Sequence, residues 1–343
     1  MIRSPSGPEI TEPILTALAS LGFRDPVLEP LDTGWGPRPG LYVVVEGPRR
    51  AVLKRIEIVG WGPRTIVHRL ARRRAMRREI AVYRALARRR WQRFRHPELL
   101  RTDGRSFLIV SYIEAAGRWP PDVVTRVVDA LLEFQMGLAG AGQADVTAPL
   151  RPRAPWWLLA RATVRRCAAR SSPLAIASVA ARMYLSVRRS RPPLVAQHGD
   201  ATFGNAFVDE DGTVTLVDFE RTRFRGRTVF DDAVQLAADR REAEGFVPST
   251  LGQYVRSWCT RSGREPAEAL DQLRLALLLH TLYVLHGYVS DEAGLAPYRR
   301  FLGTIVSDEG FRAWAGRHRI DGRTVDDGKT GDAYGGGRVG PKG

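Results

Sequence analysis

The sequence predicts an α+β protein in which the strands come first and the helices second. Short apolar runs bounded by Gly and Pro recur over residues 27–56 and again over 106–112, which is typical of strands. From residue 121 onward, apolar residues recur mainly at helical spacing, and one hairpin pattern at 206–217 interrupts them. A chain of 343 residues is long enough for two domains or two lobes.

The composition excludes several classes of protein. Hydrophobic residues make up 44% of the chain and charged residues 26%, which is typical of a soluble protein. No apolar stretch approaches the roughly 20 residues of a membrane-spanning helix, and residues 1–23 lack the apolar core of a signal peptide. Cys167 and Cys259 offer neither a disulfide framework nor metal-ligand spacing. We therefore expect a cytoplasmic protein.

The net charge of +16 is concentrated in two stretches. Residues 64–95 hold thirteen Arg and one acid, Glu79, while residues 151–191 hold ten Arg and no acid. Such a surface attracts nucleotides, nucleic acids or acidic lipid headgroups. Nucleic acid is disfavoured, because no helix-turn-helix, zinc or aromatic RNA-binding pattern accompanies the charge. Only three basic residues are Lys, and Lys54 alone lies outside the Gly-rich C-terminal segment.

The N-terminal third alternates strands with turns. A short amphipathic helix is expected over 12–22 and a long one over 63–94. A turn of Gly and Pro over 34–40 separates the first two strands. The strands are expected over 27–31, 41–46, 51–56 and 106–112.

The rest of the chain is helical around one hairpin. That hairpin joins the strands 206–208 and 213–217 through a turn at 209–212. Helices are expected over 121–138, 155–170, 173–189, 230–237, 249–262, 266–289 and 295–316. From residue 321 the chain is Gly-rich and polar without an apolar pattern, and we expect disorder there.

Three polar side chains surround the ends of this hairpin. His198-Gly199-Asp200 follows an apolar run, Asn205 comes five residues after Asp200, and the second strand delivers Asp218. Phosphoryl transfer needs a carboxylate to orient and deprotonate the acceptor hydroxyl, plus an amide and a second carboxylate to hold Mg²⁺ on the phosphates. The alternative is that these residues only make turns, as we expect of Asp209 and Asp211.

The pattern H-G-D-x-x-x-x-N, a hairpin and D-F-E resembles the catalytic segment of the kinase-like phosphotransferases. The H-G-D form resembles aminoglycoside and other small-molecule phosphotransferases, and Asp218-Phe219-Glu220-Arg221 is similar to lipopolysaccharide-type sugar kinases. The resemblance implies a bilobal protein-kinase-like fold, with a small antiparallel β lobe carrying one helix and a larger helical lobe. The nucleotide-binding lobe would span 1–114, the catalytic and acceptor-binding lobe 115–320, and a disordered tail 321–343.

The resemblance also implies ATP and Mg²⁺ as cofactors and a role for each site residue. Lys54 would bridge the nucleotide phosphates and pair with Glu79, Asp200 would serve the acceptor hydroxyl, and Asn205 and Asp218 would hold the metal. Glu79 has no basic residue three or four positions away on its own helix, which favours the pairing with Lys54.

Other positions complete the implied nucleotide site. Backbone groups near Ser111 and Ile113 would hold the adenine, and Asp231 or Asp232 would brace the catalytic loop. Gly34 and Gly36 would cover the phosphates, although their spacing departs from G-x-G-x-x-G and Pro37 and Pro39 lack backbone donors. A plain hairpin is the alternative for this loop.

The implied activity is transfer of the γ-phosphate of ATP to a hydroxyl of a small molecule, a sugar or a lipid-linked glycan. Gly199 stands where many protein kinases have Arg, and the segment at 221–230 is short, so we expect a non-protein acceptor. Thr202 and Phe203 depart from the family pattern on the acceptor side. The alternatives are an inactive nucleotide-binding interaction module and a protein kinase.

A Trp-containing basic segment suggests a second partner. Trp156 and Trp157 lie beside Leu158 and Leu159 within the acid-free stretch 151–191. Such a helix could lie on anionic lipid at the inner membrane face. The alternative is that both Trp side chains pack in the helical lobe.

Overall fold

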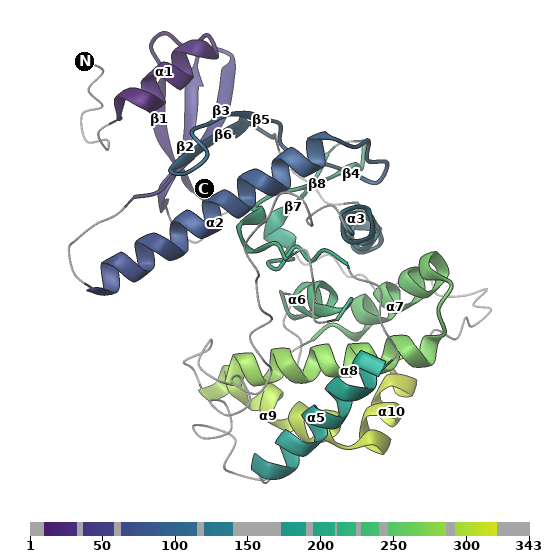
Figure 1. The fold of residues 1–343 in the computed structure, drawn as a ribbon. Coiled ribbons are helices and arrows are strands. Elements are labelled where there is room, and N and C mark those ends of the chain that lie inside the picture. Colours follow the sequence, from purple (N-terminus) through teal and green to yellow (C-terminus); the bar gives the residue numbers. More distant parts are fainter. Residues whose placement is uncertain are drawn as a thin grey trace.

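The computed structural model of the chain describes residues 10–32, 37–57, 63–114, 120–139, 173–189, 195–209, 211–223, 228–239, 246–285 and 292–320. They form two lobes, a β lobe and a helical lobe, and this α+β architecture is the predicted one (Figure 1).

The first lobe is built on a five-stranded antiparallel sheet. The strands follow the order β1 (Val27–Asp32), β2 (Pro37–Glu46), β3 (Arg49–Arg55), β6 (Phe107–Ser111) and β5 (Leu99–Thr102). Helix α1 (Glu12–Ser20) covers one face, where Leu18 packs with Leu53 and Ile109. Because side chains alternate along a strand, Lys54 and its cross-strand partner Leu108 belong to the other face.

Helix α2 (Pro63–Ala87) covers the face to which Lys54 belongs. Ile80, Tyr83 and Leu86 are buried there, in the same apolar cluster as Leu108. The helix ends at Ala87, seven residues before its predicted end at residue 94. The residues that follow form hydrogen bonds outside the helix instead of continuing it. The Trp91 indole donates to the Leu86 carbonyl at 2.9 Å, and the backbone N–H groups of Gln92 and Arg93 donate to Glu133 at 2.9 and 2.7 Å.

A small second sheet carries the predicted hairpin. Strands β7 (Ala206–Val208) and β8 (Val214–Leu216) are antiparallel, and β4 (Phe94–Arg95) pairs in parallel with β8. Neither β4 nor β5 was expected. Both are short. Strand β4 pairs with β8, which is distant in sequence, and β5 pairs with β6, which follows it.

The helical lobe is layered around α8 (Pro266–Tyr283). Helices α3 (Val123–Gly137), α6 (Asp231–Asp239) and α7 (Pro248–Ser262) lie between the small sheet and α8, whereas α5 (Pro173–Arg189), α9 (Glu292–Val306) and α10 (Asp308–Arg317) lie beyond it (Figure 1). Leu273, Leu275, Leu277, Leu278 and Leu282 of α8 are all buried. Among the helices of the described ranges, none is long and apolar enough to cross a membrane.

The helix predicted over 295–316 is two helices. Ser307 separates them, and its hydroxyl oxygen accepts from the Gly310 N–H at 3.0 Å as the N-cap of α10. Arg274 of α8 donates to the carbonyls of Ile305 and Val306 at 2.8 and 3.0 Å. These bonds satisfy the carbonyls that α9 leaves unpaired where it ends.

Candidate active site

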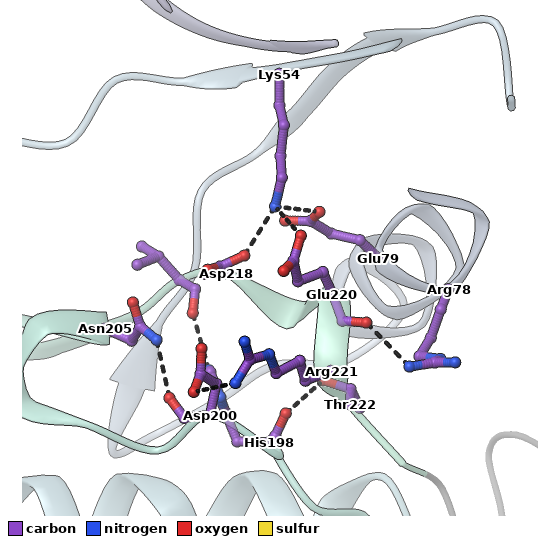
Figure 2. A network of polar contacts seen from close by, with 11 residues as sticks. Lys54, Arg78, Glu79, His198, Asp200, Asn205, Asp218, Glu220, Arg221 and Thr222 are labelled. Carbon is purple, nitrogen blue, oxygen red and sulfur yellow. Dashed lines mark hydrogen bonds and ion pairs between the residues drawn. The ribbon is translucent and has the colours of Figure 1, made fainter. Parts of the chain in front are cut away.

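Lys54 of β3 meets three carboxylates between the lobes. Its Nζ lies 2.8 Å from Glu79 Oε2, 2.8 Å from Asp218 Oδ1 and 3.1 Å from Glu220 Oε2 (Figure 2). The predicted contact between Lys54 and Glu79 is therefore present. Glu220 was not assigned to the site, although it stands in the quoted string Asp218-Phe219-Glu220-Arg221. Its only sequence signal was that position, which is usually Gly in protein kinases.

One ammonium among three carboxylates leaves the cluster with an excess of negative charge. Burial, together with Asp218 and Glu220, outweighs the attraction of Lys54 and raises the pKa of Glu79 to about 7. Burial alone would lower the pKa of Lys54, but the three carboxylates hold that pKa well above its usual value. Carboxylate oxygens of Glu79, Asp218 and Glu220 lie within 4.8 Å of one another. Such a set of hard oxygen donors with excess negative charge fits a divalent cation.

The loop at His198 is held by buried Asp232 of α6. One oxygen of Asp232 accepts from the His198 N–H at 2.8 Å and the other from the Gly199 N–H at 2.9 Å, and Gln135 of α3 donates to the same carboxylate at 2.8 Å. Of the two predicted braces, Asp232 therefore makes the contact. Asp231 accepts from the Thr228 hydroxyl at 3.0 Å instead.

Gly199 is required by the path of the backbone. Its φ is +80°, and a Cβ at this position would lie 2.3 Å from the Arg221 carbonyl oxygen. Next to it, the His198 ring nitrogen Nε2 and the Val217 carbonyl are 2.8 Å apart. This contact joins the loop to the end of the hairpin, directly before Asp218.

Asp200 and Asn205 are fixed by bonds within the loop and from α6. The Asn205 amide donates to the Asp200 carbonyl at 2.8 Å, and the Phe203 N–H donates to Asp239 at 2.8 Å. The Arg221 guanidinium lies 3.1 Å from Asp200 Oδ1, a contact that was not predicted. Partial burial raises the pKa of Asp200, and Arg221 opposes that rise.

Asp218 adopts an unusual backbone conformation, with φ 60° and ψ 63°. A non-glycine residue in the left-handed region is disfavoured and persists only where its surroundings impose it. Phe219 imposes it here, because its buried ring packs edge-on to Tyr83 of α2 at 5.2 Å and stacks on Phe134 of α3 at 5.5 Å. With Phe219 anchored inward, the Asp218 carboxylate reaches Lys54 (Figure 2).

The remaining predicted positions lie elsewhere or outside the described residues. Ser111 is the last residue of β6, three residues after Leu108, and Ile113 lies two residues beyond Ser111. The Ser111 N–H already donates to the Glu98 carbonyl at 2.9 Å, so it is not available to adenine. Gly34 and Gly36 lie outside the described residues, as does the hinge expected at 115–117.

A β lobe that carries a lysine, and a helical lobe that presents two aspartates beneath it, form the arrangement of kinase-like phosphotransferases. The chain belongs to the phosphotransferase enzyme family, whose profile matches residues 27–278. This membership agrees with the resemblance in the sequence. Among curated proteins, none matches the chain.

Solved structures share the fold. The choline kinase LicA from Streptococcus pneumoniae superposes with a TM-score of 0.51 at 13% identity, over 88% of this chain and 98% of that one. An aminoglycoside phosphotransferase from Alicyclobacillus acidocaldarius superposes with a TM-score of 0.50 at 12% identity, over 92% of this chain and 96% of that one. At these identities the likeness concerns the fold alone.

Proposed function

We propose that the chain is an ATP- and Mg²⁺-dependent phosphotransferase that moves the γ-phosphate to a hydroxyl of a small molecule, a sugar or a lipid-linked glycan. One observation carries this proposal. Three segments distant in sequence bring Lys54, Glu79 and Asp218 into direct contact, beside the loop that presents Asp200.

The residues around Lys54 divide into phosphate and metal groups. Lys54 binds the nucleotide phosphates, and Glu79 keeps its ammonium in place. Asp218 and Asn205 hold the metal, and Glu220 adds a further carboxylate within reach of Asp218. A bound Mg²⁺ neutralises charge on the phosphates as the γ-phosphate transfers. Asp200 orients the acceptor hydroxyl and takes its proton late in the transfer.

Arg221 defines the acceptor side of Asp200. Its guanidinium already contacts Asp200 Oδ1, so an acceptor hydroxyl must approach the other carboxylate oxygen or displace Arg221. The positive charge of Arg221 favours the ionised carboxylate and so opposes the rise that partial burial causes in the pKa of Asp200.

The nucleotide base is proposed to bind at the end of β6. Because the Ser111 N–H is bonded to Glu98, the adenine is assigned to other backbone groups of this segment, those of the Ser111 carbonyl and of Ile113. The Ser111 hydroxyl accepts from the Glu98 N–H at 2.8 Å and so stiffens this exit from the strand.

Asp200→Asn tests the proposal. ATP consumption is measured across sugars, aminoglycosides, lipid-linked glycans and proteins, and nucleotide affinity is measured separately. The variant should keep nucleotide affinity and lose about 10²–10⁴-fold in turnover, which is the share of a general base. Asp209→Asn, in the hairpin that follows the Asp200 loop, is the matched control, because Asp209 pairs with Arg95 at 3.0 Å and makes no contact with Lys54.

Each alternative has its own outcome. Unchanged turnover in Asp200→Asn contradicts the assignment of the base. Nucleotide binding without consumption of ATP on any acceptor favours the inactive interaction module. Turnover confined to protein acceptors favours a protein kinase.

A further inference from the structure

The N-terminal half of α2 carries exposed apolar side chains that the catalytic site does not use. Ile66 is 60% exposed, Val67 68% and Leu70 49%. Leu70 is four residues after Ile66 and three after Val67, so both neighbour it on the helix surface. The other large apolar side chains recorded as exposed in the described ranges, Val27, Met136, Leu185 and Tyr283, are on four different elements. The triplet is therefore the one such cluster among them.

The C-terminal half of α2 shows why this cluster is unusual. Met76, Ile80, Tyr83 and Leu86 are buried and anchor the helix to the body of the protein. The N-terminal half extends past the five-stranded sheet (Figure 1). The same helix thus has an anchored apolar face in one half and an exposed apolar cluster in the other.

Positive charge continues from the apolar cluster along the helix. Arg72, Arg73, Arg74 and Arg77 are all exposed, and residues 63–78 contain no acid. The one acid of α2, Glu79, is buried against Lys54. No carboxylate of the helix itself therefore offsets these arginines at the surface.

We propose that this half of α2 docks the protein on the anionic surface of a lipid bilayer. Ile66, Val67 and Leu70 enter the boundary between headgroups and acyl chains, and Arg73, Arg74 and Arg77, on the same side of the helix, contact the headgroups. Interfacial helices bind anionic bilayers through inserted apolar side chains together with Arg or Lys that contact the headgroups, and this half of α2 exposes both. A nucleic acid would leave the three apolar side chains unused, and a second copy of α2 would set arginine against arginine.

The docking proposal does not rest on the proposed catalytic activity. The docking surface and the catalytic site nevertheless share one helix, α2. Arg78 follows the arginine cluster directly and donates to the Glu220 carbonyl at 3.0 Å (Figure 2). Docking through α2 would therefore bring the cluster around Lys54 close to the bilayer. Membrane contact had been expected on residues 155–191, of which 155–172, with both Trp, and 190–191 lie outside the described residues.

Co-sedimentation of the full chain with vesicles tests the proposal. The protein should bind vesicles of phosphatidylcholine mixed with phosphatidylglycerol, not vesicles of phosphatidylcholine alone, and added salt should weaken the binding. Replacing Ile66, Val67 and Leu70 together by Ser should lower the partition coefficient at least about tenfold. Replacing Arg73, Arg74 and Arg77 together by Gln, which follow Leu70 at i+3, i+4 and i+7 on the same side of the helix, should lower it by about a hundredfold, at about fivefold for each Arg near the surface.

A double variant, Val27→Ser with Leu185→Ser, is the matched control and should bind as the wild type does. Thermal unfolding confirms that each variant is folded, and exposed positions should leave that stability unchanged. Absence of vesicle binding at low salt would overturn the proposal, as would binding that the Ser triplet leaves unchanged. Binding to duplex RNA without vesicle binding would instead assign the arginines to nucleic acid. A dimer that the Ser triplet dissociates would assign the cluster to self-association.

Discussion

Asp232→Ala should loosen the catalytic loop, because Asp232 holds two of its backbone N–H groups. The carboxylate is 0% exposed and accepts three hydrogen bonds, from the backbone N–H groups of His198 and Gly199 and from the Gln135 amide. Alanine would leave three donors in the interior without their acceptor.

The magnitude follows from these three bonds. A hydrogen bond to a charged group contributes about 1.5–3 kcal/mol, so the three contribute about 4–9 kcal/mol before any compensation. Burial opposes the ionised carboxylate and raises its pKa, so its removal recovers part of that loss. We expect a net destabilisation of about 3–5 kcal/mol, the usual range for breaking a buried charge network.

Denaturant unfolding measures this loss, and ATP turnover of the folded fraction measures its effect on catalysis. Turnover should fall about a hundredfold, because Asp200 follows Gly199 and small displacements of a reacting group are costly. Asp231→Ala is the control, since Asp231 is only partly buried and bonds the Thr228 hydroxyl. A loss of stability in Asp232→Ala that is no larger than in Asp231→Ala would refute the reasoning.

Three further outcomes follow from the same site. Lys54→Arg should abolish ATP turnover although it keeps the charge, because a planar guanidinium cannot replace an ammonium among three carboxylates; turnover near wild type would contradict this. The pKa of Glu79 is raised in the fold, so its share of stability is complete below pH 4.5 and is lost as pH rises through about 7. Unfolding measured across this window should show that Glu79→Gln lacks the decline, and an unaltered decline would assign it to other groups. Gly199→Ala should cost about 1–3 kcal/mol of unfolding free energy and lower turnover, because φ is +80° and the Cβ meets the Arg221 carbonyl; a fully active, stable variant would exclude this strain.

The sequence by itself determined the elements and the set of candidate residues. Apolar spacing of two and of 3.6 residues encodes which side of an element is buried, and this is why the hairpin at 206–217 and most helices lie where they were predicted. Asp200, Asn205 and Asp218 were identifiable because the chemistry restricts residue type and spacing over a short segment. Lys54 stood out as the one Lys outside the C-terminal segment, and Glu79 as the one acid of the Arg-rich residues 64–95. The nucleotide and metal roles of these residues remain predictions.

Only the tertiary structure decided which of these residues touch and where several elements end. Helix α2 stops at Ala87 because Trp91, Gln92 and Arg93 bond elsewhere, and the helix expected over 295–316 is interrupted at Ser307. The choice of Asp232 over its neighbour Asp231 depends on which side of α6 faces the loop. Glu220 and Arg221 reach Lys54 and Asp200 because the buried ring of Phe219 sets the direction of the chain. Packing between segments far apart in sequence determines each of these contacts, and a local sequence pattern cannot predict that packing.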